Sequence, residues 1–188
     1  MAQKWTVERL MQADRKTLED VLLTGPSPDW EKASGYIYNG MNHEPVTKVI
    51  SGEKFKKGFL KKADGKVHGY NELVEQDRRG VQGEWKTRLR NGRPTHVGFF
   101  RSSLVKDERP QKLFRPYLHL GYLDYAVPEN KWTWTSFLST VKDFAVLPNP
   151  GDHELILCKA YLQPFRGLNI FYCYFTLNNP EPIKYKPW

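Results

Sequence analysis

The chain contains only two cysteines, Cys158 and Cys173, and their spacing is that of neither a zinc site nor a redox pair. Each lies in an apolar run, where a free thiol behaves as a small hydrophobic side chain, so we expect both to be reduced and buried. No apolar run is long enough for a membrane-spanning helix. The N-terminal segment also lacks the apolar stretch of a signal peptide. These absences predict a soluble, cytoplasmic protein.

The short motifs that mark common catalytic and nucleotide-binding sites are missing too. The sequence has no phosphate-binding loop, no glycine-rich dinucleotide fingerprint, no G-x-S-x-G turn and no H-E-x-x-H helix. Its five histidines are scattered, and no two of them have the spacing of metal ligands. We therefore expect no catalytic residues, no metal and no cofactor, and we favour a protein that is not an enzyme.

Positive charge is concentrated in one part of the chain. Residues 48–93 hold 13 Lys and Arg against 6 Asp and Glu, a balance of +7, and the whole chain carries +8. Such a concentration attracts anions. Aromatic residues are interleaved with these cations, as in proteins that bind single-stranded nucleic acid. An acidic protein partner, an anionic ligand or membrane surface, and a merely solvated surface are the alternatives. The predicted basic face comprises Lys54, Lys56, Lys57, Lys61, Lys62, Arg88 and Arg90.

The first 25 residues have the pattern of a helix. Thr6 is a good N-cap, and apolar residues recur at helical spacing on one face as far as Leu22. Asp14 interrupts that face, so two short helices are the alternative. The Gly25-Pro26 pair ends the helical pattern. We expect this segment to pack across a sheet or to plug it.

After the helix the pattern changes to short runs of strand-forming residues separated by turns. Residues 54–76 predict a hairpin, because Asp64-Gly65 is a favoured two-residue turn. This turn would pair Phe59 with Tyr70. One face of the hairpin would then carry Phe55, Phe59, Tyr70 and Val74.

Further segments have the composition of strands: 35–40, 84–89, 95–105, 113–127, 154–162 and 168–177. The last two are apolar on both faces, which indicates strands that are covered on both sides. The sequence thus predicts a mainly β (α+β) fold, an antiparallel barrel-like or strongly bent sheet of about eight strands with an N-terminal helix. We expect one domain over 1–188, with the helix in 1–25, the β-rich core in 35–177 and an extended, proline-rich tail in 178–188.

Aromatic residues are abundant, with 10 Tyr, 10 Phe and 6 Trp. Rings that point into a barrel either line a ligand cavity or fill the interior completely. His119 lies in an otherwise apolar segment, where a hydrogen-bonded core histidine is the favoured interpretation. The candidate ligand-binding residues are Tyr70, Trp85, Phe99, Tyr117, His119, Tyr161 and Tyr172.

Three stretches carry a resemblance to known proteins: Phe55-Lys56-Lys57-Gly58-Phe59, Gly69-Tyr70-Asn71 and Lys159-Ala160-Tyr161-Leu162. Together they resemble a family of uncharacterised bacterial proteins of similar length, over most of the chain after the first helix. This resemblance implies no activity. The number of strands and the Gly83-Glu84-Trp85 step are similar to lipocalin-type barrels in architecture only, because the lipocalin G-x-W lies near the start of the barrel and this one lies in mid-chain.

These observations leave three hypotheses for function. We favour a small-molecule-binding, β-barrel-like protein for an apolar or amphipathic ligand, with an anionic head group near Lys57 or Arg88 as one option. The alternative is an accessory or interaction subunit that docks its basic face on an acidic protein partner, with nucleic acid as the less favoured partner. An enzyme built from distant residues around His119 or Tyr161 ranks third.

Overall fold

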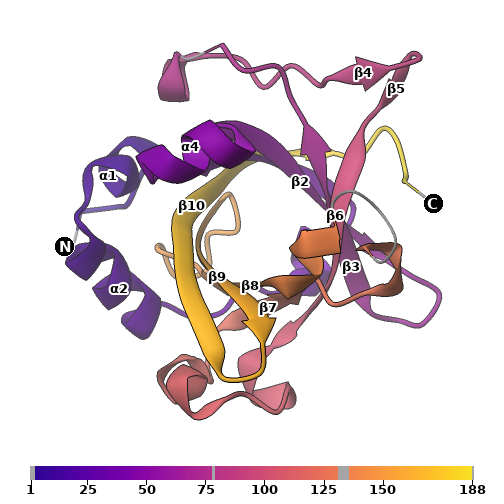
Figure 1. Cartoon of the computed structure of the whole chain (residues 1–188). Coiled ribbons are helices and arrows are strands. Elements are labelled where there is room, and N and C mark those ends of the chain that lie inside the picture. Colours follow the sequence, from indigo (N-terminus) through magenta and orange to yellow (C-terminus); the bar gives the residue numbers. More distant parts are fainter. Residues whose placement is uncertain (1–2, 78, 131–135, 188) are drawn as a thin grey trace.

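A computed structural model describes residues 3–77, 79–130 and 136–187, and its main strands form one closed barrel (Figure 1). The order around the barrel is β1, β10, β9, β8, β7, β6, β3, β2, and all neighbouring pairs are antiparallel. The predicted mainly β fold with eight antiparallel strands is confirmed. The strands are Tyr36–Asn42 (β1), Lys54–Lys61 (β2), Val67–Leu73 (β3), His96–Leu104 (β6), Gly121–Asp124 (β7), Val141–Val146 (β8), Leu155–Phe165 (β9) and Leu168–Pro182 (β10).

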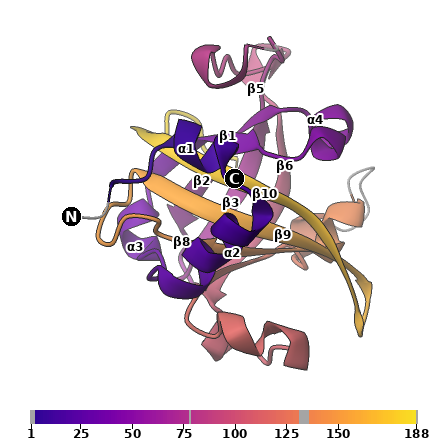
Figure 2. The ribbon, with the colours of Figure 1, turned by 90° about the vertical axis from the view of Figure 1, so that its left-hand side faces the viewer.

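Two helices precede the barrel, as in the alternative that Asp14 suggested. The helices are α1 (Val7–Gln12) and α2 (Arg15–Thr24). The side chain of Asp14 accepts a hydrogen bond of 2.7 Å from the backbone N–H of Thr17, so Asp14 caps α2 and breaks the helical run. Both helices lie on the outside of the barrel, along the side formed by β8, β9 and β10 (Figure 2).

The molecule has two hydrophobic cores, one on each side of the barrel wall. The inner core fills part of the barrel and includes both cysteines, which are free and buried as expected. The outer core lies between the barrel wall and the segments packed outside it, among them α1, α2 and the 3₁₀ segment Lys112–Tyr117 (η3). Because β8 separates the two cores, all six of its residues are buried. Residues 155–160 of β9 are buried on both faces in the same way.

The two ends of the barrel differ. At one end lies α3 (Trp30–Ala33), whose Trp30 ring stacks on Phe59 with 5.3 Å between ring centroids. The Trp30 indole N–H donates to the carbonyl oxygen of Ser103 at 2.8 Å, which fixes the ring over this end. At the opposite end lie α4 (Pro45–Ser51) and the 3₁₀ turn Ser136–Thr140 (η5) (Figure 2).

The register of the first hairpin differs from the prediction by one residue. Phe59 pairs with Gly69 and not with Tyr70. The reason is a three-residue loop: Lys62 and Lys66 still pair through a backbone hydrogen bond, and Gly65 takes the left-handed conformation with φ 77°. A shift of one residue moves every side chain of β3 to the other face. Tyr70 therefore lies outside the barrel, so the predicted shared face with Phe55 and Phe59 is wrong.

Two other predicted strands are much shorter than expected. In the segment 113–127, only Gly121–Asp124 is a strand, and residues up to Tyr117 belong to η3. Pro116 contributes to this difference because it has no N–H to donate to a sheet. The segment 84–89 also does not form a strand of the barrel, although an isolated antiparallel bridge between Val74 and Thr87 connects it to the end of β3. Its last residue begins a separate ribbon of β4 (Leu89–Arg90) and β5 (Arg93–Pro94), joined by the predicted Asn91-Gly92 turn.

The last strand is longer than expected. β10 continues to Pro182, where it pairs with Tyr36 of β1. The first part of the segment expected as an extended tail therefore closes the barrel. None of the helices in the described ranges has the length and apolar character needed to cross a bilayer.

Candidate functional site

A cavity of about 290 Å³ lies inside the barrel at the end flanked by α4 and η5. This volume is at the lower limit of the range typical of small-molecule sites. Ile50 and Phe137 border it and are 68% and 54% exposed, so the cavity communicates with solvent on this side. Most of the lining is apolar and includes Phe55, Leu73, Val97, Leu138, Val141 and Phe175.

Four polar side chains of the lining form one group, which we call the polar cluster: Lys57, Asn71, Tyr125 and Asp143. Lys57 lies in β2, Asn71 in β3 and Asp143 in β8, and Tyr125 directly follows β7. The ammonium of Lys57 lies 3.3 Å from Asp143 Oδ2 and donates a hydrogen bond to the hydroxyl of Tyr125. Tyr125 in turn donates to Asp143 Oδ2 at 2.8 Å. Lys57 and Asp143 are each only 1% exposed, so this is an ion pair of the interior.

Aromatic rings surround the Lys57 ammonium. Its nitrogen lies 4.6 Å from the ring centroid of Phe100, 5.0 Å from that of Tyr125 and 5.2 Å from that of Phe175. The negative faces of such rings stabilise a cation. Burial nevertheless lowers the pKa of Lys57, and the charge of Asp143 only partly opposes this. Burial likewise raises the pKa of Asp143, and the charge of Lys57 partly opposes it. The pair is thus held together against a large desolvation cost.

Two oxygens of the polar cluster have no hydrogen-bond donor among the described residues. They are Asp143 Oδ1 and Asn71 Oδ1, and both are buried. A buried acceptor without a donor is costly, and native proteins rarely leave one without a water or ligand. Both residues line the cavity. The cavity therefore offers unused acceptors to whatever fills it.

Local irregularities of the strands orient part of this lining. The pairing of β9 with β10 shifts between Phe171 and Cys173, which marks a bulge. A bulge adds one residue to a strand and changes its alternation. As a result the consecutive residues Tyr172 and Cys173 both line the cavity. A second shift occurs between Gly69 and Asn71, where β3 pairs with β6.

Of the seven residues predicted to bind a ligand, Tyr172 lines the cavity, and its hydroxyl is hydrogen-bonded to Ser51 of α4. Tyr117 and Tyr161 belong to the outer core. His119 is exposed, and its ring nitrogen lies 3.2 Å from the carbonyl oxygen of Leu22. None of these three borders the cavity.

The remaining three candidates lie on the outside of the barrel wall. Tyr70 packs across Gly58, and its hydroxyl donates to the carbonyl oxygen of Tyr185 in the C-terminal segment. The indole of Trp85 donates to the carbonyl oxygen of Gly40 at 2.9 Å. Phe99 is half-buried in β6, and its backbone N–H donates to a side-chain oxygen of Asn130.

The residues of the predicted basic face are divided between the interior and the surface. Lys57 belongs to the polar cluster, and Lys54 is 2% exposed, with its ammonium 2.6 Å from Asp77. Two others are ion-paired at the surface, Lys61 with Glu31 and Lys62 with Glu129, each at 2.8 Å. Lys56 is half-buried, and the exposed members include Arg88 and Arg90.

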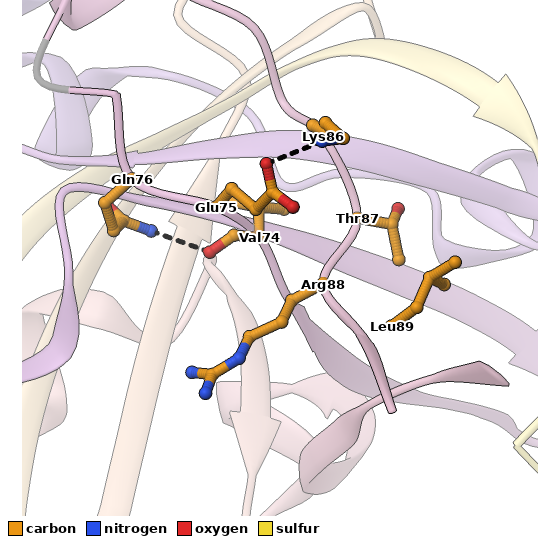
Figure 3. Close-up of a pocket in the computed structure, with 7 residues that line it drawn as sticks. All are labelled: Val74, Glu75, Gln76, Lys86, Thr87, Arg88 and Leu89. Carbon is orange, nitrogen blue, oxygen red and sulfur yellow. Dashed lines mark hydrogen bonds and ion pairs between the residues drawn. The ribbon is translucent and has the colours of Figure 1, made fainter. Parts of the chain in front are cut away.

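A second hollow lies on the surface, between the end of β3 and the segment before β4 (Figure 3). Its volume is about 630 Å³, but five of its seven lining residues are exposed. Glu75 and Lys86 are ion-paired with each other at 2.9 Å across it, and Gln76 donates to the carbonyl oxygen of Val74. Most polar side chains of this groove are already engaged and the groove is open to solvent, so the barrel cavity is the better candidate site.

The sequence pointed to Lys57 but not to the groups that define its surroundings. Asn71, Tyr125 and Asp143 belong to strands or loops far apart in the chain, and only the barrel brings them together. One signal was available: Lys142 and Asp143 lie within an otherwise apolar segment, 141–147, and a charged residue is rarely buried unless it has a partner.

Within the described residues, no three His, Cys, Asp or Glu side chains are grouped so that they could hold a metal ion. No family model, no curated protein and no solved structure matches the chain. The resemblance to a bacterial family and to lipocalin-type barrels thus gains no support beyond the barrel architecture itself. The case for a binding site rests on the cavity and its polar cluster.

Proposed function

We propose that the protein binds a small amphipathic molecule inside its barrel. The observation that carries this proposal is a cavity with mostly apolar walls in which two buried acceptors, Asn71 Oδ1 and Asp143 Oδ1, lack a donor. Apolar walls contribute binding free energy through burial of the ligand. A few placed polar groups then fix its orientation. A protein that only needed a filled barrel would gain nothing from such a combination.

The entrance is consistent with exchange of such a ligand. Ile50 of α4 and Phe137 of η5 border the cavity and are exposed, although both are large and apolar. Val46 and Val49 of α4 are also exposed. Apolar residues at the edge of a cavity lower the cost of passing an apolar molecule from solvent to the interior.

Docking of the basic face on an acidic partner is the second proposal, and it ranks lower. Four of the seven cations, Lys54, Lys57, Lys61 and Lys62, are paired with carboxylates of the same chain. Their charge is therefore partly neutralised before any partner approaches. Docking of this kind predicts binding that weakens steeply with added salt.

The test uses the methyl groups of the protein as reporters. Methyl-labelled protein is titrated with a small amphipathic probe, octanol, and followed by NMR. We expect the resonances of Leu73, Val97 and Val141, which line the cavity, to shift with saturation. Those of Leu18 and Leu22, in the outer core, are the matched control and should stay in place.

A uniform response of both groups of methyls, or no response up to the solubility of several such probes, would overturn the proposal. A different outcome would favour the interaction subunit: an acidic protein co-purifies and dissociates at moderate salt, and the methyl resonances of the cavity do not shift with any probe.

A further inference from the structure

We propose that the cavity selects uncharged ligands that donate a hydrogen bond, of which alcohols are the simplest class, over carboxylates of the same shape. The inference rests on the proposed function, since it concerns the chemistry of a ligand inside the barrel. It also makes the expected ligand more specific, because the sequence alone left an anionic head group as one option.

The first argument is a count of donors. Tyr125 has one O–H, and it is donated to Asp143. Lys57 donates to Tyr125 and to Asp143, and aromatic rings surround its ammonium. The side-chain amide N–H₂ of Asn71 faces the carbonyl oxygen of Gly98 at 3.4 Å. Four of the six N–H and O–H groups of the polar cluster are thus directed at partners within the protein, and aromatic rings surround the ammonium that carries the third N–H of Lys57.

The second argument is the acceptors that remain. Asp143 uses Oδ2 for both of its partners, and its Oδ1 has none. Asn71 Oδ1 likewise has no hydrogen-bond donor among the described residues. A carboxylate or ether oxygen cannot satisfy either of them, because it has no hydrogen to give. A hydroxyl can donate to Asp143 Oδ1, and a hydrogen bond to a charged acceptor is among the stronger kinds.

The third argument is the charge of the lining. Lys57 and Asp143 are its only residues with a formal charge among those described, and they cancel. An anionic ligand would enter a site without net positive charge and lie close to the carboxylate of Asp143. A cationic amine would meet the Lys57 ammonium beside the same carboxylate. Burial of an unpaired ion is costly, so an uncharged ligand is favoured over both.

The experiment compares ligands that share one carbon skeleton. The first series is octanol, octanoate and heptyl methyl ether, and the second is phenylethanol, phenylacetate and benzyl methyl ether. Affinities are measured by calorimetry on the full chain at neutral pH. We expect the alcohol to bind about tenfold more tightly than the ether and the carboxylate in at least one series, because only the alcohol supplies the missing donor.

Two double variants locate the effect. Lys57→Met with Asp143→Leu replaces the buried ion pair by apolar groups, and the ratio of alcohol to ether affinity should fall clearly below its wild-type value while ether binding persists. The matched control is Lys142→Met with Asp124→Leu. It also removes an ion pair, but these two residues, which neighbour Asp143 and Tyr125 in the chain, do not line the cavity. Here the ratio should keep its wild-type value. If the first double variant does not fold, the single variant Asn71→Leu takes its place. It removes the second acceptor without a donor and should also lower the ratio of alcohol to ether affinity.

The outcomes separate the inference from the proposed function. Ether and alcohol of equal affinity, or a carboxylate that binds most tightly, would overturn the inference and leave ligand binding in place. If no member of either series binds and the cavity methyls do not respond, the proposed function fails and the inference fails with it. An unchanged preference in the Lys57→Met, Asp143→Leu variant would show that the donor is recognised elsewhere.

Discussion

At the scale of single residues, the buried pair of Lys57 and Asp143 is the most consequential feature of the molecule. Each partner makes the burial of the other tolerable, since an unpaired ion in the interior is far more costly than a paired one. The pair is therefore weak evidence for stability, and we propose another reason for its presence. In this barrel that reason is recognition of a ligand at Asp143 Oδ1.

The variant Lys57→Met tests the mutual dependence of the pair. It leaves the carboxyl of Asp143 buried without its cation, and we expect a loss of about 3–5 kcal/mol in the free energy of unfolding. In the double variant with Asp143→Leu most of this loss should be recovered. Urea unfolding of the two variants and the wild type provides the measurement. A double variant that is no more stable than the single one would contradict the argument.

The same variant carries a pH dependence whose sign follows from the pKa of Asp143. Burial raises the pKa of this carboxyl in the folded state, and without Lys57 the opposing influence is lost. A carboxyl with a raised folded pKa contributes its full stability below the unfolded value and loses it as pH rises through the folded pKa. The difference in free energy of unfolding between wild type and Lys57→Met should therefore become smaller as the pH falls from neutral toward the ordinary pKa of a carboxyl group.

At the scale of elements, Glu19 joins α2 to the barrel. Its carboxylate accepts hydrogen bonds from Lys159 of β9 and Tyr174 of β10, each at 2.6 Å, and from Tyr117 of η3. The donors hold the pKa of Glu19 below its usual value although burial opposes them. One side chain thus connects a helix, a 3₁₀ segment and two strands, and its loss should loosen all of these contacts.

Glu19→Ala should lower the free energy of unfolding by about 2 kcal/mol, because hydrogen bonds to a charged group are lost and the buried Lys159 loses its carboxylate partner. The matched control is Asp20→Ala on the same helix. Asp20 is exposed, and the structure gives its carboxylate no bond among the described residues, so this change should be nearly neutral. The free energies of unfolding are measured with denaturant. Equal losses in the two variants would show that the contacts of Glu19 do not contribute to stability.

The elements also show what the sequence could and could not predict. Alternation and turn signals predicted seven of the eight barrel strands but did not mark out β8 (Val141–Val146), and the interruption of the apolar face at Asp14 suggested the break between α1 and α2. The predicted register of the β2–β3 hairpin was wrong because Asp64-Gly65 also fits a three-residue loop, which is the next most common hairpin connection. The polar cluster was out of reach because it depends on that register: Asn71 faces Lys57 only in the observed pairing.

At the scale of the whole molecule, the barrel is asymmetric around its wall. β8 and residues 155–160 of β9 lie between the inner and outer cores, whereas the ribbon of β4 and β5 leaves the barrel and has a single short pairing. Local opening costs most where both faces of a strand are covered. Asp143 lies in β8, the part of the wall where local unfolding costs most, and this keeps the polar cluster in place. A ligand can enter at the end of the barrel near α4.

Amide hydrogen exchange should display this asymmetry. We expect the amides of Val141–Val146 to exchange most slowly, with a protection close to the free energy of global unfolding, and the amides of residues 89–93 to exchange at least about 100-fold faster. The comparison is made within one sample by NMR or mass spectrometry. Ligand should add protection around the cavity and leave residues 89–93 unchanged, since the ribbon does not border it. Protection that is equal in the two regions would mean that the barrel opens as one unit, and the division into a rigid wall and an accessible end would then be wrong.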